Sequence, residues 1–149
     1  MYANILIPTD GSPLAGQAVE TGVALAKALG SRVTVMTVVE PFDVMEHFTT
    51  DDHVRLDEIM ARYERGASAH AAEVLGAAAA RAGEAGVAAK TVQVVGSRPW
   101  EAILKTAEEQ GADLIVMASH GRKGVSALLV GSETLKVLTH SKIPVHVLR

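Results

Sequence analysis

Five short runs of branched aliphatic residues, separated by longer segments with helix signals, constrain the fold of this chain more than any other feature of its sequence. The runs are residues 5–7, 33–39, 92–95, 114–117 and 145–148. Most of them are apolar at consecutive positions, a pattern typical of strands that are covered on both faces. A half-solvated antiparallel strand would instead alternate polar and apolar residues. The sequence therefore predicts a parallel sheet with helices on both sides.

The segments between these runs carry signals for the ends of helices. Ser12 followed by Pro13 predicts an N-cap and a first helical position, and Gly30 stands where a glycine would end that helix. A long alanine-rich helix is expected from about Asp52 to Arg81. Two shorter helices are expected, one from Pro99 to Gly111 and one capped by Ser132 that runs to about His140.

The resulting order of elements, β-α-β-α-β-α-β-α-β, predicts a three-layer α/β/α sandwich with right-handed crossovers. We expect residues 1–149 to form a single domain, because this length suits one core and no linker-like segment interrupts the order. The irregular segment 41–51 is expected to be a connection whose apolar residues pack down, with a lid or a partner-binding loop as the alternative.

Composition excludes several classes of partner and chemistry. A formal net charge of −3 and scattered aromatic residues argue against a nucleic-acid-binding surface. The chain has no cysteine, which excludes disulfides, thiolate nucleophiles and cysteine-ligated metal sites. The N-terminus lacks the features of a signal peptide, and no apolar stretch approaches the roughly 20 residues that span a membrane. We therefore expect a soluble, cytoplasmic protein without membrane or nucleic-acid partners.

Two loops are candidates for a ligand site, because ligands of such sheets bind beyond the carboxyl ends of the strands. The first loop, 8–12, places the carboxylate of Asp10 just before a helix. The second, 117–124, contains glycines and basic residues, and Gly131 and Ser132 follow it at the start of the last helix. Backbone amides at a helix N-terminus favour a phosphate. These residues alone support a phosphate site and a structural glycine loop about equally, since neither standard glycine fingerprint is present.

The spacing of four small residues around the second loop has a known counterpart. Ala118, Gly121, Gly131 and Ser132 match G-x2-G-x9-G-[ST] with alanine in place of the first glycine. This pattern resembles that of the nucleotide-binding universal stress proteins, and the opening Ile-Leu-Ile-Pro-Thr-Asp-Gly-Ser and the closing segment 143–148 extend the resemblance over the whole chain. It implies a five-stranded parallel sheet in the order 3-2-1-4-5, an adenine nucleotide alpha hydrolase-like fold.

The resemblance also implies an ATP site, with Mg²⁺ accompanying the nucleotide. Residues after the first two strands lie against the nucleoside, and those around the last helix start lie against the phosphates. The implied nucleotide-binding residues are Pro8, Thr9, Asp10, Val38, Val39, Met117, Ala118, Gly121, Arg122, Gly131, Ser132, Glu133 and Thr134. The methyl group of Ala118 would obstruct a ligand packed directly on that Cα, so we expect ATP binding to be weaker than the full motif implies. The resemblance further implies a homodimer through strand 143–148, whose edge is otherwise little protected.

Two functions are compatible with this sequence. The first is a homodimeric ATP-binding stress-response protein in which nucleotide occupancy changes the surface offered to a protein partner. The alternative is a nucleotide-free dimeric interaction module of the same fold, which the alanine at position 118 keeps open. No catalytic residues are assigned, because Ser119 and His120 lack a hydrolase elbow, and any ATPase activity is expected to be slow. No metal site is predicted from the histidines, and Trp100 is expected to pack a helix start.

Overall fold

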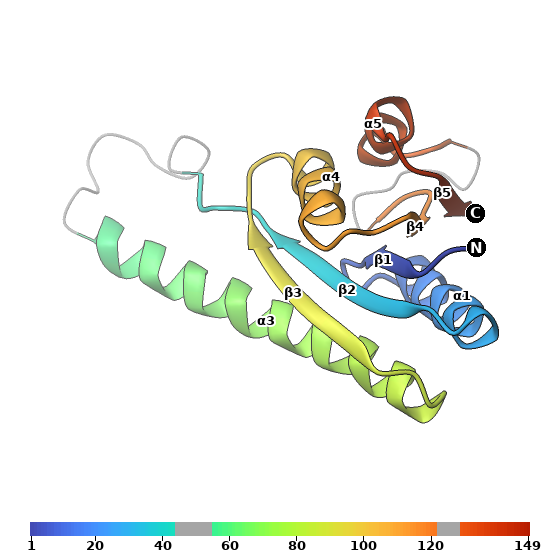
Figure 1. Ribbon diagram of the computed structural model, residues 1–149. Coiled ribbons are helices and arrows are strands. Elements are labelled where there is room, and N and C mark those ends of the chain that lie inside the picture. Colours follow the sequence, from blue (N-terminus) through green and yellow to red (C-terminus); the bar gives the residue numbers. More distant parts are fainter. Residues whose placement is uncertain (44–54, 122–128) are drawn as a thin grey trace.

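The computed structural model, which describes residues 1–43, 55–121 and 129–149, has the predicted order of elements. Its strands are β1 (Asn4–Pro8), β2 (Arg32–Val39), β3 (Ala89–Val95), β4 (Leu114–Ala118) and β5 (Val145–Leu148). All neighbouring pairs are parallel, and the five strands form one sheet in the order β3-β2-β1-β4-β5 (Figure 1). Both the α/β class and the strand order implied by the resemblance are confirmed.

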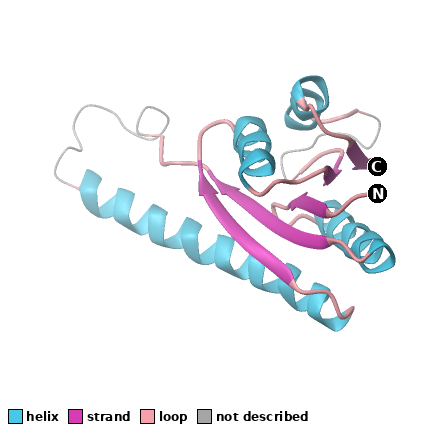
Figure 2. Ribbon diagram, in the orientation of Figure 1, coloured by secondary structure: helices cyan, strands magenta, loops and turns pink. Residues whose placement is uncertain are grey.

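Four described helices cover the two faces of this sheet (Figure 2). They are α1 (Pro13–Leu29), α3 (Leu56–Glu84), α4 (Pro99–Glu109) and α5 (Ser132–His140). Val23 of α1 and Leu75 of α3 belong to a core cluster with Ile5 and Ile7 of β1. Ile103 of α4 and Val137 of α5 belong to a second cluster with Leu6, Met36 and Ile115 of the strands. The chain is therefore a three-layer sandwich, with α1 and α3 on one face and α4 and α5 on the other.

Alternation along the strands explains the continuous apolar runs. Ile5 and Ile7 face α1 and α3, while Leu6 between them faces α4 and α5, and all three are almost completely buried. A central strand must therefore be apolar at every position, because successive side chains point to opposite covered faces. Edge strand β3 is different, since exposed and half-buried residues alternate along most of its length.

Helix ends follow the predicted signals closely at α1 and less closely elsewhere. The Ser12 hydroxyl accepts a hydrogen bond from the Ala15 N–H at 3.3 Å, and Gly30 ends α1 with a φ of 70° that favours glycine. The prediction that Ser132 caps α5 is off by one residue, because Gly131 is the N-cap and no side chain caps this helix. Among the described residues, the first-turn amides of α5 receive no bond from an N-cap side chain.

Other boundaries differ from the predictions by a few residues. Helix α3 ends at Glu84 rather than Arg81, and α4 ends at Glu109, two residues before Gly111. The expected start of α3 at Asp52 lies outside the described residues, as does most of the irregular segment predicted at 41–51.

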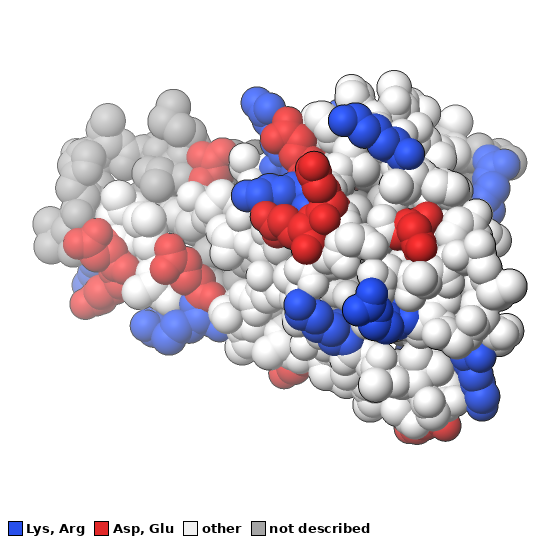
Figure 3. All heavy atoms as spheres, viewed as in Figure 1, with Lys and Arg blue, Asp and Glu red and all other residues white. Residues whose placement is uncertain are grey.

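Two surface properties follow from the described residues. None of the helices they form is long and apolar enough to cross a membrane. On the face seen in Figure 3, Lys and Arg side chains lie among Asp and Glu side chains, so charges of both signs are interspersed there.

Candidate functional site

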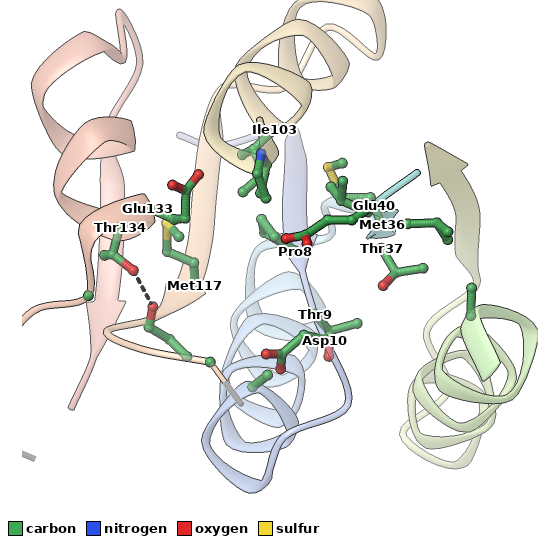
Figure 4. Close-up of a pocket in the computed structure, with 18 of the residues that line it drawn as sticks. Pro8, Thr9, Asp10, Met36, Thr37, Glu40, Ile103, Met117, Glu133 and Thr134 are labelled. Atoms are coloured by element: carbon green, nitrogen blue, oxygen red, sulfur yellow. Dashed lines mark hydrogen bonds between the residues drawn. The ribbon is translucent and has the colours of Figure 1, made fainter. Parts of the chain in front are cut away.

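A cavity of about 630 Å³ lies at the carboxyl ends of β1, β2 and β4, between the two helix layers (Figure 4). Every described residue predicted for the site lines it: Pro8, Thr9, Asp10, Val38, Val39, Met117, Ala118, Gly121, Gly131, Ser132, Glu133 and Thr134. The thirteenth predicted residue, Arg122, lies outside the described residues, as do Lys123 and Gly124 of the same loop. The fold thus brings together in one cavity residues from four separate segments of the sequence.

The loop after β1 is held by its own polar side chains. The Thr9 backbone N–H donates to the Met36 carbonyl at 2.8 Å, which fixes the loop to β2. The Gly11 N–H donates to Thr9 Oγ1 at 3.3 Å, and the Ser12 N–H donates to Asp10 Oδ1 at 2.9 Å. Asx and ST turns of this kind make a short loop rigid. The Asp10 carboxylate is therefore held in a defined position at the cavity wall.

Gly121 allows the loop after β4 to approach that carboxylate. A Cβ atom built at Gly121 would collide with Asp10 Oδ2, so a larger residue there would have to displace that carboxylate. The middle glycine of the predicted motif is thus required by the packing of the two loops against each other.

Gly131 allows the start of α5 to lie against the end of β4. Its N–H donates to the Ser119 carbonyl at 2.6 Å, and a Cβ atom built there would lie 3.1 Å from the same oxygen and 3.4 Å from His120 Cα. His120 also lines the cavity, with its Nδ1 3.1 Å from Ser119 Oγ. The last glycine of the motif therefore permits the close approach that brings the α5 amides to the cavity.

The methyl group of Ala118 packs between the sheet and α1. It is 8% exposed and belongs to a small cluster with Ala15 and Ala18, against which Leu148 also packs. Its carbonyl oxygen accepts a hydrogen bond from Thr134 Oγ1 at 3.0 Å, drawn as a dashed line in Figure 4. Position 118, where the motif has its first glycine, therefore accommodates the extra methyl group against α1. The buried Thr134 fixes the start of α5 to β4.

Glu133 links the two helices on the other side of the cavity. Its Oε2 accepts a hydrogen bond from the Trp100 backbone N–H at 2.9 Å, and Figure 4 shows the carboxylate turned toward α4. The N-cap residue of α4, Arg98, makes no side-chain capping bond of its own. Trp100 packs against the core cluster beneath α4 and α5, as predicted, and its ring lies 4.6 Å from that of His140. A side chain of α5 thus caps α4.

One wall of the cavity was not predicted from the sequence. Tyr63, Ala67, His70 and Ala71 of α3 line it, and the Tyr63 hydroxyl donates to the Glu40 carbonyl at 3.2 Å. The three positions 63, 67 and 71 follow a spacing of four, which places them on one face of a helix. That spacing indicates a shared helix face, and the place of Glu40 directly after a strand indicates the edge of the sheet where the cavity lies. The other lining residues that were missed are Ala15, Met36, Thr37, Pro99 and Ile103.

Comparison with known proteins identifies the family of this chain. A sequence profile described as the universal stress protein family matches residues 1–149. The chain belongs to the universal stress protein family. This universal stress protein is 30% identical over 154 residues to universal stress protein YxiE of Bacillus subtilis, with 100% of both chains covered.

Solved structures of universal stress proteins have the same fold. Universal stress protein UspA from Lactobacillus plantarum is similar with a TM-score of 0.84 and 27% identity, covering 99% of this chain and 98% of that one. A universal stress protein in complex with cAMP is similar with a TM-score of 0.70 and 27% identity, covering 99% and 97%.

Three carboxylates belong to the described lining of the cavity of this universal stress protein. Among its described lining residues, Asp10, Glu40 and Glu133 carry carboxylates, and none is a lysine or an arginine. In Figure 4, Glu133 lies at the start of α5, Glu40 lies just after β2, and Asp10 lies in the loop after β1. Hydrogen-bond donors at the α5 end come from the backbone amides of the first helical turn.

Proposed function

We propose that this universal stress protein binds an adenine nucleotide, with ATP and its accompanying Mg²⁺ as the physiological ligand, in the cavity at the carboxyl ends of the strands. The observation that carries the proposal is the convergence on one cavity of all described residues that match the family's nucleotide motif. A structural neighbour of 27% identity is in complex with cAMP, which supports the choice of an adenine nucleotide.

The shape of the cavity suits such a ligand. Its volume of about 630 Å³ lies within the range of roughly 300–1,000 Å³ that is common for small-molecule sites. The apolar residues Val38, Val39 and Ala67 line the cavity and could pack against a base. Asp10 offers a carboxylate to ribose hydroxyls, and the uncapped start of α5 offers amides to phosphates.

The proposal extends to assembly and regulation. Residues 1–149 act as one domain of a cytoplasmic homodimer, joined through segment 143–148. Strand β5 supports this, because it pairs with β4 on one side only and lies at the edge of the sheet. Nucleotide occupancy would change the surface offered to a protein partner, since α3, α4 and α5 all contribute to the cavity. Any hydrolysis of ATP is expected to be slow, because no catalytic set is assigned.

The test compares two glycine variants. Gly131→Val adds an isopropyl group at a position where its Cβ atom alone would lie 3.1 Å from the Ser119 carbonyl oxygen. Gly76→Val adds the same group to α3, where nothing lies within 4 Å of the Cβ position. We expect a nucleotide at 100 times its Kd to stabilise the unaltered protein by about 2.7 kcal/mol. Gly76→Val should keep this stabilisation, and Gly131→Val should lose it while retaining its circular dichroism spectrum.

The same protein preparation identifies the ligand directly. Mass spectrometry of small molecules released from freshly purified protein should find an adenine nucleotide. If Mg-ATP, AMP and cAMP all leave the melting temperature of the unaltered protein unchanged, the proposal fails.

The alternative is a nucleotide-free interaction module. It is favoured by three leucines that are exposed on and just before α5, namely Leu129, Leu135 and Leu138. Exposed apolar residues on one helix are typical of protein contacts. This function predicts that Leu135→Glu weakens self-association or partner binding in a protein that no nucleotide stabilises.

A further inference from the structure

Thr134 in the first turn of α5 carries a buried hydroxyl group that is bonded to β4. Its Oγ1 donates a hydrogen bond to the Ala118 carbonyl oxygen at 3.0 Å, and the residue is only 3% exposed (Figure 4). A threonine hydroxyl has a single hydrogen, which this bond uses. While the bond is made, the hydroxyl cannot donate to a phosphate, although Thr134 lines the cavity and the family resemblance implies that it binds nucleotide.

The start of α5 is attached to the end of β4 at two points. The Gly131 N–H donates to the Ser119 carbonyl at 2.6 Å, and the Thr134 hydroxyl donates to the neighbouring carbonyl of Ala118. The first bond is formed by the backbone alone, whereas the second depends on a side chain. One bond fixes a single point of a helix, and a second bond at another residue also fixes its orientation. The hydroxyl of Thr134 therefore sets the direction in which α5 leaves β4.

The direction of α5 matters because its first turn lies at the cavity. Ser132, Glu133 and Thr134 all line it. The N–H groups of these three residues precede the first bond within the helix, which the Leu135 N–H donates to the Gly131 carbonyl at 2.9 Å. N–H groups in such positions point along the helix axis and bind an anion together. Where they point is therefore decided by the orientation of the helix start.

We propose that Thr134 is a positioning residue, whose hydroxyl holds the first turn of α5 in the orientation that binds a phosphate group and does not itself contact the ligand. The inference rests on the proposed nucleotide function and deepens it. Binding groups must be held within about 0.5 Å of the productive geometry by side chains that are themselves fixed. The buried bond between Thr134 and Ala118 meets this requirement for the α5 amides.

Thr134→Val replaces the hydroxyl by a methyl group of similar size. A methyl carbon needs about 3.3–3.6 Å from a carbonyl oxygen. It cannot take the place of an oxygen at 3.0 Å, so it must push the start of α5 away from β4. Thr134→Ser keeps the hydroxyl, and Thr134→Ala removes it without putting a methyl group in its place.

Thr139→Val is the matched control for the loss of a hydroxyl from α5. The Thr139 hydroxyl also donates to a backbone carbonyl, that of Leu135 at 2.8 Å. Thr139 is not among the described residues that line the cavity, and its bond lies within the helix. Both valine variants therefore lose one hydroxyl-to-carbonyl bond of the same helix, and only one of these bonds joins α5 to β4.

The experiment measures Kd by titration calorimetry for AMP and for adenosine, which differ only in the phosphate group. Thr134→Val should weaken AMP binding about tenfold and adenosine binding less than about twofold, because only the phosphate uses the α5 amides. Thr134→Ala should weaken AMP binding about threefold, since the Gly131 bond still attaches the helix and no methyl group pushes it away. Thr134→Ser and Thr139→Val should bind both ligands as the unaltered protein does.

Two outcomes would overturn the inference. Equal losses of AMP and adenosine affinity in Thr134→Val would mean that the residue only maintains the fold. Equal losses of AMP affinity in Thr134→Val and Thr134→Ala would mean that the hydroxyl contacts the phosphate directly. The order of AMP affinities decides the matter even where adenosine binds too weakly to measure.

Folding and the underlying function are checked separately. Circular dichroism shows whether each variant is folded at the temperature of the titration. If Thr134→Val does not fold, the comparison of Thr134→Ala with Thr134→Ser takes its place, with AMP about threefold weaker in the first and unchanged in the second. Absence of binding of both AMP and Mg-ATP to the unaltered protein would instead refute the proposed function, and the inference with it.

Discussion

The two ends of the sheet differ in what surrounds their polar groups: other segments of the chain at the amino end, and a cavity at the carboxyl end. At the amino end, Asp113 accepts hydrogen bonds from the N–H groups of Ala3 at 2.8 Å and Asn4 at 2.9 Å. The Ser31 hydroxyl donates to the Tyr2 carbonyl at 2.6 Å. These bonds join the start of β1 to the segments that precede β2 and β4, so this end of the sheet is closed by the chain itself.

At the carboxyl end, the corresponding polar groups line a cavity. The side chains of Thr9 and Asp10 bond within their own loop, and α5 begins without a side-chain cap. The glycines at positions 121 and 131 let the loops approach closely without filling the cavity. The amino end of the sheet thus contributes to stability and to alignment of the strands, and the carboxyl end forms the cavity in which we propose that a nucleotide binds.

The largest expected effect is a change at the carboxyl end that leaves the amino end intact. Gly121→Ala places a methyl group on Asp10 Oδ2 and must displace that carboxylate, so we expect affinity for AMP to fall at least about tenfold. Gly66→Ala is the control, because it adds the same methyl group to α3 with nothing within 4 Å. Calorimetric titration should find unaltered affinity in the control, together with a stability gain of about 0.5–1 kcal/mol. Equal affinity in both variants would break the assignment of binding to this end.

A smaller effect, on stability alone, is expected at the amino end. Asp113→Ala removes the acceptor of two backbone N–H groups and should lower the free energy of unfolding by about 1–2 kcal/mol. Urea unfolding with and without Mg-ATP measures this loss together with the stabilisation by nucleotide. The stabilisation should be the same as in the unaltered protein, because distant sites act additively. A reduced stabilisation would mean that the two ends are coupled.

The smallest effect is a dependence on pH. Burial acts to raise the pKa of Asp113, but the N–H groups of Ala3 and Asn4 outweigh it and hold the pKa below its ordinary value. A lowered pKa in the folded state means that the ionised form stabilises the fold above the unfolded pKa of about 3.9, and that this contribution is lost as pH falls through the lower folded value. The stability difference between the unaltered protein and Asp113→Asn should therefore shrink below about pH 4 in urea titrations. A constant difference down to pH 2 would contradict this.

Much of the fold and part of the site could be predicted because their signals are local. Consecutive apolar residues such as Ile5, Leu6 and Ile7 indicate a strand with two covered faces, and Ser12 with Pro13 indicates a helix start. The place of Asp10 directly after a strand made the first loop of the cavity a candidate, and the motif glycines Gly121 and Gly131, with the family resemblance, did so for the second. In each case the residues that carry the information are close together in the sequence.

The parts that could not be predicted depend on how distant elements pack. The spacing of Tyr63, Ala67 and Ala71 places them on one face of α3, but only the path of the helix across the sheet brings that face to the cavity. The bond between Glu133 and the Trp100 N–H joins residues 33 positions apart and requires the two helix starts to be adjacent. The methyl group of Ala118 could be assigned to the α1 side only once the alternation of β4 was known.

The contact between α4 and α5 also gives this protein a natural optical reporter. Trp100 is the single tryptophan of the chain. Its backbone N–H donates a hydrogen bond to Glu133 at the cavity, and the centroid of its ring lies 4.6 Å from that of the His140 ring. Any shift of one helix against the other alters the surroundings of that one indole. Its intrinsic fluorescence can therefore follow events at the α5 end of the cavity in solution, without an attached dye.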